Sequence, residues 1–197
     1  MSLRSPPPLG RDLTVIGTSE GLELRDGDLL VAEGAPAELD LEATEAVDPE
    51  RAAEASRAGH QRWSAEHPFP TCFACGPARR VGDGLRLFPG SLGDGRFAAP
   101  WTPAQTLADD AGIVRPEYVW AALDCPTSAP VAEFGGAVAV LAQLHARIDR
   151  PIAASAPHAI VSWPIGIDGR KRLAACAVFD ADGRPAALSR ALWMELR

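Results

Sequence analysis

The sequence predicts an α+β fold in which a curved antiparallel sheet wraps a central helix. The first observation is a set of four strand-like stretches near the end of the chain, with turns containing Asp and Gly between the last three. The second is a helix-like stretch just ahead of them, where Pro116 suits a first helical turn and Tyr118, Val119 and Leu123 have helical spacing. The strand-like stretches are residues 137–149, 158–168, 172–180 and 185–196.

The first part of the chain predicts three more short strands within residues 9–42, because apolar residues alternate with polar ones between Gly and Asp turns. Residues 43–66 are rich in Ala, Glu and Arg, and Asp48 followed by Pro49 is typical of a helix start. We expect a solvated connecting helix there. The predicted organisation is a strand segment at 1–42, a helical linker at 43–67 and the main domain at 68–197.

Strands are predicted again at 84–90 and 95–103, joined by a Gly-rich turn. Residues 25–42 and 181–197 also share a pattern, which is an Asp-Gly turn, a strand of small residues and an acidic-apolar end. The N-terminal segment could therefore be part of a second, truncated copy of the main domain. A generic β-meander explains the same pattern without any repeat.

Composition excludes several classes of function. The chain has 197 residues, 47% of them hydrophobic, which is enough for one domain with a substantial core. The net charge of −7 disfavours a nucleic-acid partner, because phosphate binding needs a basic face. No apolar run approaches the ~20 residues that span a bilayer. The start of the chain lacks the apolar segment of a signal peptide. We expect a cytoplasmic protein with neither nucleic acid nor membrane as a partner.

The stretch "FPTCFACGPARR" at 69–80 places Cys72 and Cys75 in a C-x-x-C pattern. A redox motif normally follows a strand and begins a helix, and no such pattern surrounds this one. A zinc site needs four ligands, which His60 and His67 would complete, but no second cysteine pair exists. We expect a structural turn with no metal and no cofactor, and a zinc-stabilised interaction module remains an alternative.

The segment "CFACGPARRVGDGLRLFPG" at 72–90, followed by "DGRFAAPWTP", resembles the opening of many hotdog-fold thioesterase-like proteins. The stretch "GIVRPEYVWAALD" at 112–124 stands where the phenylacetyl-CoA thioesterase-like group has His-Gly-Gly and, seven residues on, a catalytic carboxylate. In that register Arg115, Pro116 and Glu117 replace His-Gly-Gly, and Asp124 falls on the carboxylate. The resemblance covers about 68–197, with 9–42 similar to a truncated second hotdog.

The resemblance implies a thioesterase-like protein that acts on an acyl-CoA or a related thioester. It places the reaction beside the helix start, with Asp124 and Glu117 as catalytic candidates. It also implies a homodimer, because hotdog proteins usually build their site between two copies. The candidate substrate-binding residues are Arg115, Tyr118, Trp120 and Cys125 along the helix, and Arg170, Lys171 and Arg172 for the CoA phosphates.

One departure from the family pattern affects the chemistry. Helix-start glycine amides hold the thioester carbonyl in the family, whereas Pro116 has no N–H to donate. The alternative function is therefore a non-catalytic acyl or CoA binder that has lost this device.

Overall fold

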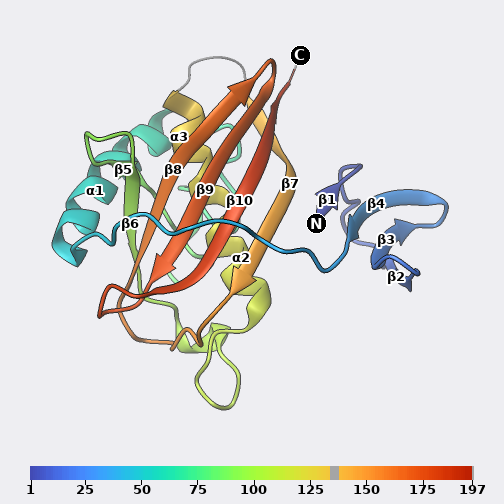
Figure 1. The fold of residues 1–197 in the computed structure, drawn as a ribbon, viewed down its shortest axis with the longest axis horizontal. Helices are drawn as coiled ribbons and strands as arrows, with labels where there is room; N and C mark the ends of the chain where they lie inside the picture. Colours follow the sequence, from blue (N-terminus) through green and yellow to red (C-terminus); the bar gives the residue numbers. More distant parts are fainter. Residues whose placement is uncertain (134–137, 197) are drawn as a thin grey trace.

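The computed structural model describes residues 1–133 and 138–196. Its main feature is one antiparallel sheet of ten strands, which does not close on itself (Figure 1). The strand order across the sheet is β2-β3-β4-β1-β7-β10-β9-β8-β6-β5. The strands are β1 (Ser2–Leu3), β2 (Thr14–Gly17), β3 (Leu22–Asp26), β4 (Leu29–Gly34), β5 (Gly90–Ser91), β6 (Phe97–Trp101), β7 (Ala139–Ile148), β8 (His158–Asp168), β9 (Lys171–Phe179) and β10 (Pro185–Glu195).

Two groups of helices flank the sheet. The long helix α1 (Pro49–Glu66) precedes the main domain, and its N-cap Asp48 accepts hydrogen bonds from the N–H groups of Glu50 and Arg51. A second, broken helical run follows β6. It consists of α2 (Pro116–Asp124), the 3₁₀ turn η2 (Cys125–Thr127) and α3 (Ser128–Glu133), with a further 3₁₀ turn, η1 (Gln105–Leu107), ahead of it.

Each face of the sheet carries its own apolar layer. On one face Val119 and Leu123 of α2 pack with Ile160 and Val178 of the sheet. The next side chain along each strand points to the other face, and Val161, which follows Ile160, packs there in a cluster with Leu39 and Ala52. This division follows from the two-residue period of a strand. The segment between β4 and α1 crosses that second face in Figure 1.

The predicted α+β architecture is confirmed, including the four antiparallel strands near the end of the chain and the helix that begins at Pro116. The three N-terminal strands are also present as β2, β3 and β4. They extend the main sheet, because Ser2 of β1 pairs with Gln143 of β7. No helix within residues 1–133 and 138–196 is long and apolar enough to cross a membrane.

Two sequence expectations are wrong in detail. Helix α1 is not solvated all round, because Ala52 is fully buried and Gly59 lies against the backbone of Pro89. The strand expected at 84–90 is reduced to Gly90 and its neighbour. The reason is local, since Arg86 has a positive φ of 53°, which interrupts extended pairing.

Candidate functional site

Helix α2 packs on one face of the sheet, and its first turn offers few free donors. The Arg115 N–H donates to Leu107 O at 3.0 Å, and the Tyr118 N–H donates to Arg115 O at 3.0 Å. Pro116 has no N–H. The remaining amide of this turn belongs to Glu117, whose side chain is exposed and forms an ion pair with Arg115 at 3.3 Å. The Arg115 guanidinium also donates to the Tyr118 hydroxyl at 3.0 Å.

Asp124 ends helix α2 and is the most unusual carboxylate of the described chain. Its Oδ1 is enclosed and has no hydrogen-bond partner among the described residues. Burial, with a smaller contribution from the charge on Cys72, raises the pKa of Asp124 to about 7. Trp120 lies four residues earlier, so the two side chains leave the same side of the helix one turn apart.

Three thiols gather beside this helix end. The Sγ atoms of Cys72, Cys75 and Cys125 all lie within 4.8 Å of one another, and the Cys72 and Cys125 sulfurs are 3.4 Å apart. His67 adjoins them, with its Nε2 at 3.2 Å from the Cys75 sulfur. His60, the other histidine considered from the sequence, instead packs on Phe88 with ring centroids 4.5 Å apart.

The thiols share their protons unequally. Hydrogen bonds from Cys125 and Cys75, together with the backbone N–H groups of Cys75 and Ala74, lower the pKa of Cys72 to about 2. The same side-chain hydrogen bonds, with burial, raise the pKa of Cys125 well above its ordinary value. Burial lowers the pKa of His67. The hydrogen bonds among these thiols thus favour a thiolate at Cys72 and a protonated thiol at Cys125.

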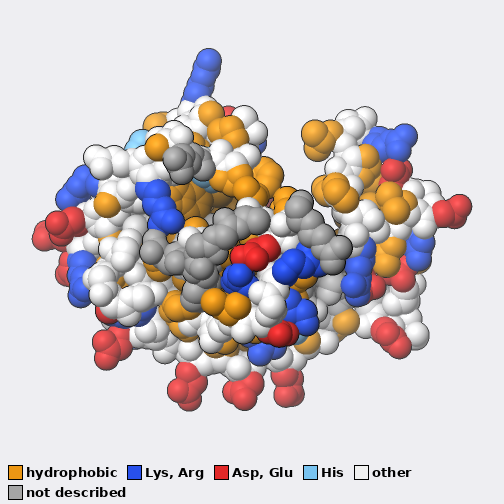
Figure 2. Space-filling model, turned by 90° about the horizontal axis from the view of Figure 1, so that it is seen from above, with side chains coloured by type: hydrophobic (Ala, Val, Ile, Leu, Met, Phe, Trp, Pro, Cys, Tyr) orange, Lys and Arg blue, Asp and Glu red, His pale blue; other side chains and the backbone are white. Residues whose placement is uncertain are grey.

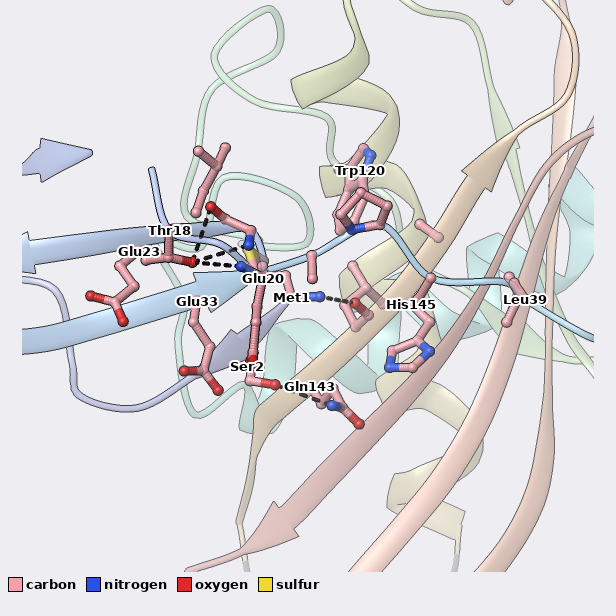
Figure 3. A pocket seen from close by; sticks show the side chains of 18 residues that line it. Met1, Ser2, Thr18, Glu20, Glu23, Glu33, Leu39, Trp120, Gln143 and His145 are labelled. Atoms are coloured by element: carbon pink, nitrogen blue, oxygen red, sulfur yellow. Dashed lines mark hydrogen bonds between the residues drawn. The ribbon is translucent and has the colours of Figure 1, made fainter. Parts of the chain in front are cut away.

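A cavity of about 520 Å³ separates the N-terminal strands from β7 and helix α2 (Figure 3). Trp120 enters it from α2 and His145 from β7, while Glu20, Glu23 and Glu33 line the opposite side. No Lys or Arg occurs among the described residues that line it. Arg4 and Arg25 form ion pairs with Glu33 and Glu23, so the wall opposite Trp120 carries paired charges, whereas Trp120 itself forms an aromatic wall.

His145 stands out within this cavity. Its Nδ1 is enclosed and has no hydrogen-bond partner among the described residues. Burial lowers its pKa, so the ring is neutral at pH 7. The sequence does not single out His145, because the alternating pattern of its strand gives no sign of a cavity.

The predicted phosphate-binding cluster lies at the other end of the sheet. Arg172 is buried and pairs with Glu195 at 2.5 Å, and Arg170 donates to the Glu195 backbone carbonyl at 3.1 Å. Lys171 lies 3.5 Å from Asp168. These residues flank the β8–β9 turn, near α3, whereas the start of α2 lies toward the opposite end of the sheet (Figure 1). The structure brings together the candidates on α2 and separates them from this cluster.

The architecture matches solved structures of thioesterase superfamily proteins. One such protein superposes with a TM-score of 0.55 and 24% identity, over 61% of this chain and 61% of that chain. The fold is the hotdog fold. A thioesterase from Haemophilus influenzae matches this hotdog chain with a TM-score of 0.54 and 13% identity, over 61% of this chain and 85% of that one.

A third match is a point mutant of the phenylacetic acid degradation protein PaaI from Thermus thermophilus. Its TM-score is 0.50 with 18% identity, over 56% of this chain and 93% of that one. No protein-family profile matches the sequence. No curated protein matches it either. At these identities the matches establish the hotdog fold and leave its chemistry to be argued from the residues.

Proposed function

We propose that this hotdog protein binds a small thioester, such as an acyl-CoA, and hydrolyses it slowly with Asp124 as the catalytic carboxylate. The observation that carries the proposal is the enclosed, unpartnered Oδ1 of Asp124 at the end of the central helix. A buried polar atom without a partner is uncommon in a folded protein and marks a candidate functional group. A carboxylate at this point can take a proton from an attacking water molecule, or attack the thioester carbonyl itself.

The cavity beside Trp120 is the proposed place for the acyl group. Trp120 supplies an apolar wall. Asp124 is not among the residues that line the cavity and lies one helical turn further along α2. His145 also lines the cavity, and its enclosed Nδ1 could contact a bound molecule after the ring turns toward the cavity. Glu33 and Glu23 on the opposite wall are ion-paired with Arg4 and Arg25. The carboxylate of Glu20 also lines that wall, so we expect neutral acyl groups to bind better than acyl groups with a free carboxylate.

A specific observation favours a second candidate, a binder without catalysis. The amides of Arg115 and Tyr118 are already hydrogen-bonded, and Pro116 has none, so the carbonyl would find few donors at the helix start. Losing one such donor typically lowers turnover by ~10²–10³. Two further roles rank lower, because the side chains involved are exposed or engaged in ion pairs. They are a catalytic role of Glu117 and phosphate binding by Arg170, Lys171 and Arg172.

Hydrolysis of an acyl-CoA panel tests the proposal. The panel contains short, long, aromatic and carboxylated acyl groups, and thiol release is measured with the wild type and with Asp124→Asn. We expect slow hydrolysis of neutral acyl groups by the wild type and its loss in Asp124→Asn, because the amide keeps the shape and removes the charge. Asp182→Asn, in the exposed β9–β10 turn, is the matched control.

The outcomes separate the candidates. Hydrolysis that survives Asp124→Asn contradicts the catalytic assignment. Binding of acyl-CoA by calorimetry without any hydrolysis by the wild type supports the non-catalytic binder. Neither binding nor hydrolysis across the panel would reject a thioester function as a whole.

A homodimer is proposed separately, on the exposed apolar side chains of the N-terminal strands. Val15 is 62% exposed and Leu22 is 58% exposed. A second copy would cover them, and the molar mass from light scattering checks this. A mass of one chain at micromolar concentration would contradict it.

A further inference from the structure

The strongest feature outside the proposed thioester site is the thiol cluster beside the end of α2. We propose that Cys72, Cys75 and Cys125 bind a Zn²⁺ ion as thiolates and that His67 completes a tetrahedral site. This proposal reverses our sequence-based expectation of no metal. None of its ligands takes a chemical step in the proposed hydrolysis, although Cys125 is a substrate-binding candidate and the charge of Cys72 contributes to the raised pKa of Asp124.

The first argument is the distance between the sulfurs. Thiolates about 2.3 Å from a tetrahedral zinc ion lie about 3.8 Å from one another. The three sulfurs all lie within 4.8 Å of one another, and the Cys72–Cys125 distance is 3.4 Å. Cys72 and Cys125 are 53 residues apart in the chain, so the fold itself brings them together. The sequence therefore contains a third cysteine ligand that a search for a second C-x-x-C pair misses.

The second argument is the shape of the loop. The Gly76 N–H donates to Cys72 O at 2.8 Å and closes the turn. A Cβ at Gly76 would lie 2.5 Å from that same oxygen, so only glycine fits there. The loop is thus held in a conformation that presents the Cys72 and Cys75 sulfurs to one point.

The third argument is the fourth ligand. His67 lies on the segment that leads into the loop, with Nε2 at 3.2 Å from the Cys75 sulfur. Its ring is not within 4.8 Å of all three sulfurs, so the side chain must shift toward them to bind the ion. In the structure Nδ1 of His67 accepts a hydrogen bond from the Phe69 N–H at 2.9 Å, which makes Nε2 the protonated nitrogen. Binding of zinc through Nε2 requires the proton to move to Nδ1, so this contact with Phe69 must open when the ion binds.

The site would be structural and not catalytic, because four protein ligands leave no open position on the ion. It would fasten the loop of residues 69–76 to the end of α2. Phe73 of the same loop already contacts Tyr118 in the first turn of α2, with ring centroids 5.9 Å apart. A disulfide is the competing fate of these thiols, since the Cys72 and Cys125 sulfurs are close enough to react after a small shift.

The experiment begins with the full chain purified without chelator. Elemental analysis and native mass spectrometry measure zinc, with about one ion per chain expected. The zinc is then replaced by Co²⁺ and the absorption spectrum is measured. A tetrahedral Co²⁺ site with thiolate ligands gives intense visible and near-ultraviolet bands, so the spectrum identifies the type of ligand. This measurement uses the wild type, so it stands even if a variant fails to fold.

Variants then assign the ligands. Cys125→Ser should lose the zinc, whereas Cys176→Ala should keep it, because Cys176 is a fully buried thiol outside the cluster. His67→Ala should weaken zinc retention against a competing chelator, and His60→Ala should not. Chelation of the wild type should lower its unfolding temperature, since the ion binds only the folded state.

Three results would overturn the proposal. They are a chain without bound metal, with its thiols free or with Cys72 and Cys125 in a disulfide, a Co²⁺ spectrum without thiolate bands, and full zinc content in Cys125→Ser. Zinc retention by His67→Ala equal to that of His60→Ala would overturn the fourth ligand.

Discussion

Among single residues, Thr127 has a clear structural role, because it holds the end of helix α2 in place. It is fully buried, and its hydroxyl donates to the backbone carbonyl of Asp124 at 2.5 Å. The hydroxyl oxygen of Thr127 also accepts a hydrogen bond from the indole N–H of Trp193 at 2.8 Å. The hydroxyl therefore links the helix end that carries Asp124 to strand β10.

We predict that Thr127→Val lowers the free energy of unfolding by about 1–3 kcal/mol, because the buried indole N–H of Trp193 loses its acceptor. Urea unfolding measures the change. A double-mutant cycle with Trp193→Phe isolates the contact, since the valine substitution should cost less once the indole donor is gone. Equal costs in both backgrounds would mean that the hydrogen bond contributes nothing.

The structural role of a single residue could be predicted from the sequence only where neighbouring residues in the chain determine that role. Asp48 and Pro49 specify the start of α1 through the cap they form, and the spacing after Pro116 specifies α2. Cys125 illustrates the opposite case. Its neighbours Cys72 and Cys75 come from a loop about 50 residues away along the chain. No sequence pattern near Cys125 predicts this contact.

At the scale of elements, helix α1 packs on the sheet through glycines. A Cβ at Gly90 of β5 would lie 1.8 Å from the backbone oxygen of Ala55. A Cβ at Gly59 of α1 would lie 2.5 Å from Phe88 O. The backbones are thus in direct contact, which is why the linker expected to be solvated has a buried face.

We predict that Gly90→Ala lowers the free energy of unfolding by about 1–3 kcal/mol, because the methyl group forces helix and strand apart. Gly166→Ala is the matched control in the same sheet. It has open space at its Cβ position and a φ outside the left-handed range, so its effect should stay within about 0.5 kcal/mol. The urea midpoints of the two variants check the difference, and equal midpoints would contradict close packing of α1.

At the scale of the whole molecule, the N-terminal strands stand apart from the main body with hydrophobic side chains on their surface (Figure 2). Their link to it runs through β1, which pairs with β7, and through the segment that crosses the sheet. Leu39 of that segment is buried in the second apolar layer. The alternation of apolar and polar residues predicted the N-terminal strands themselves. How they pack on the main sheet depends on contacts between distant parts of the chain, which the sequence does not show.

Arg147 of β7 holds this crossing segment in place, and it provides the last test. Its guanidinium donates to Leu39 O at 2.7 Å and pairs with Asp149 at 2.9 Å. We predict that Arg147→Ala speeds amide exchange in residues 36–48 while strands β8 to β10 stay protected, at a cost of about 1 kcal/mol, because the Arg147 side chain is 43% exposed. Hydrogen–deuterium exchange with mass spectrometry measures this. Arg150→Ala, exposed on the same turn, is the control, and equal exchange in both variants would show that apolar burial alone holds the segment.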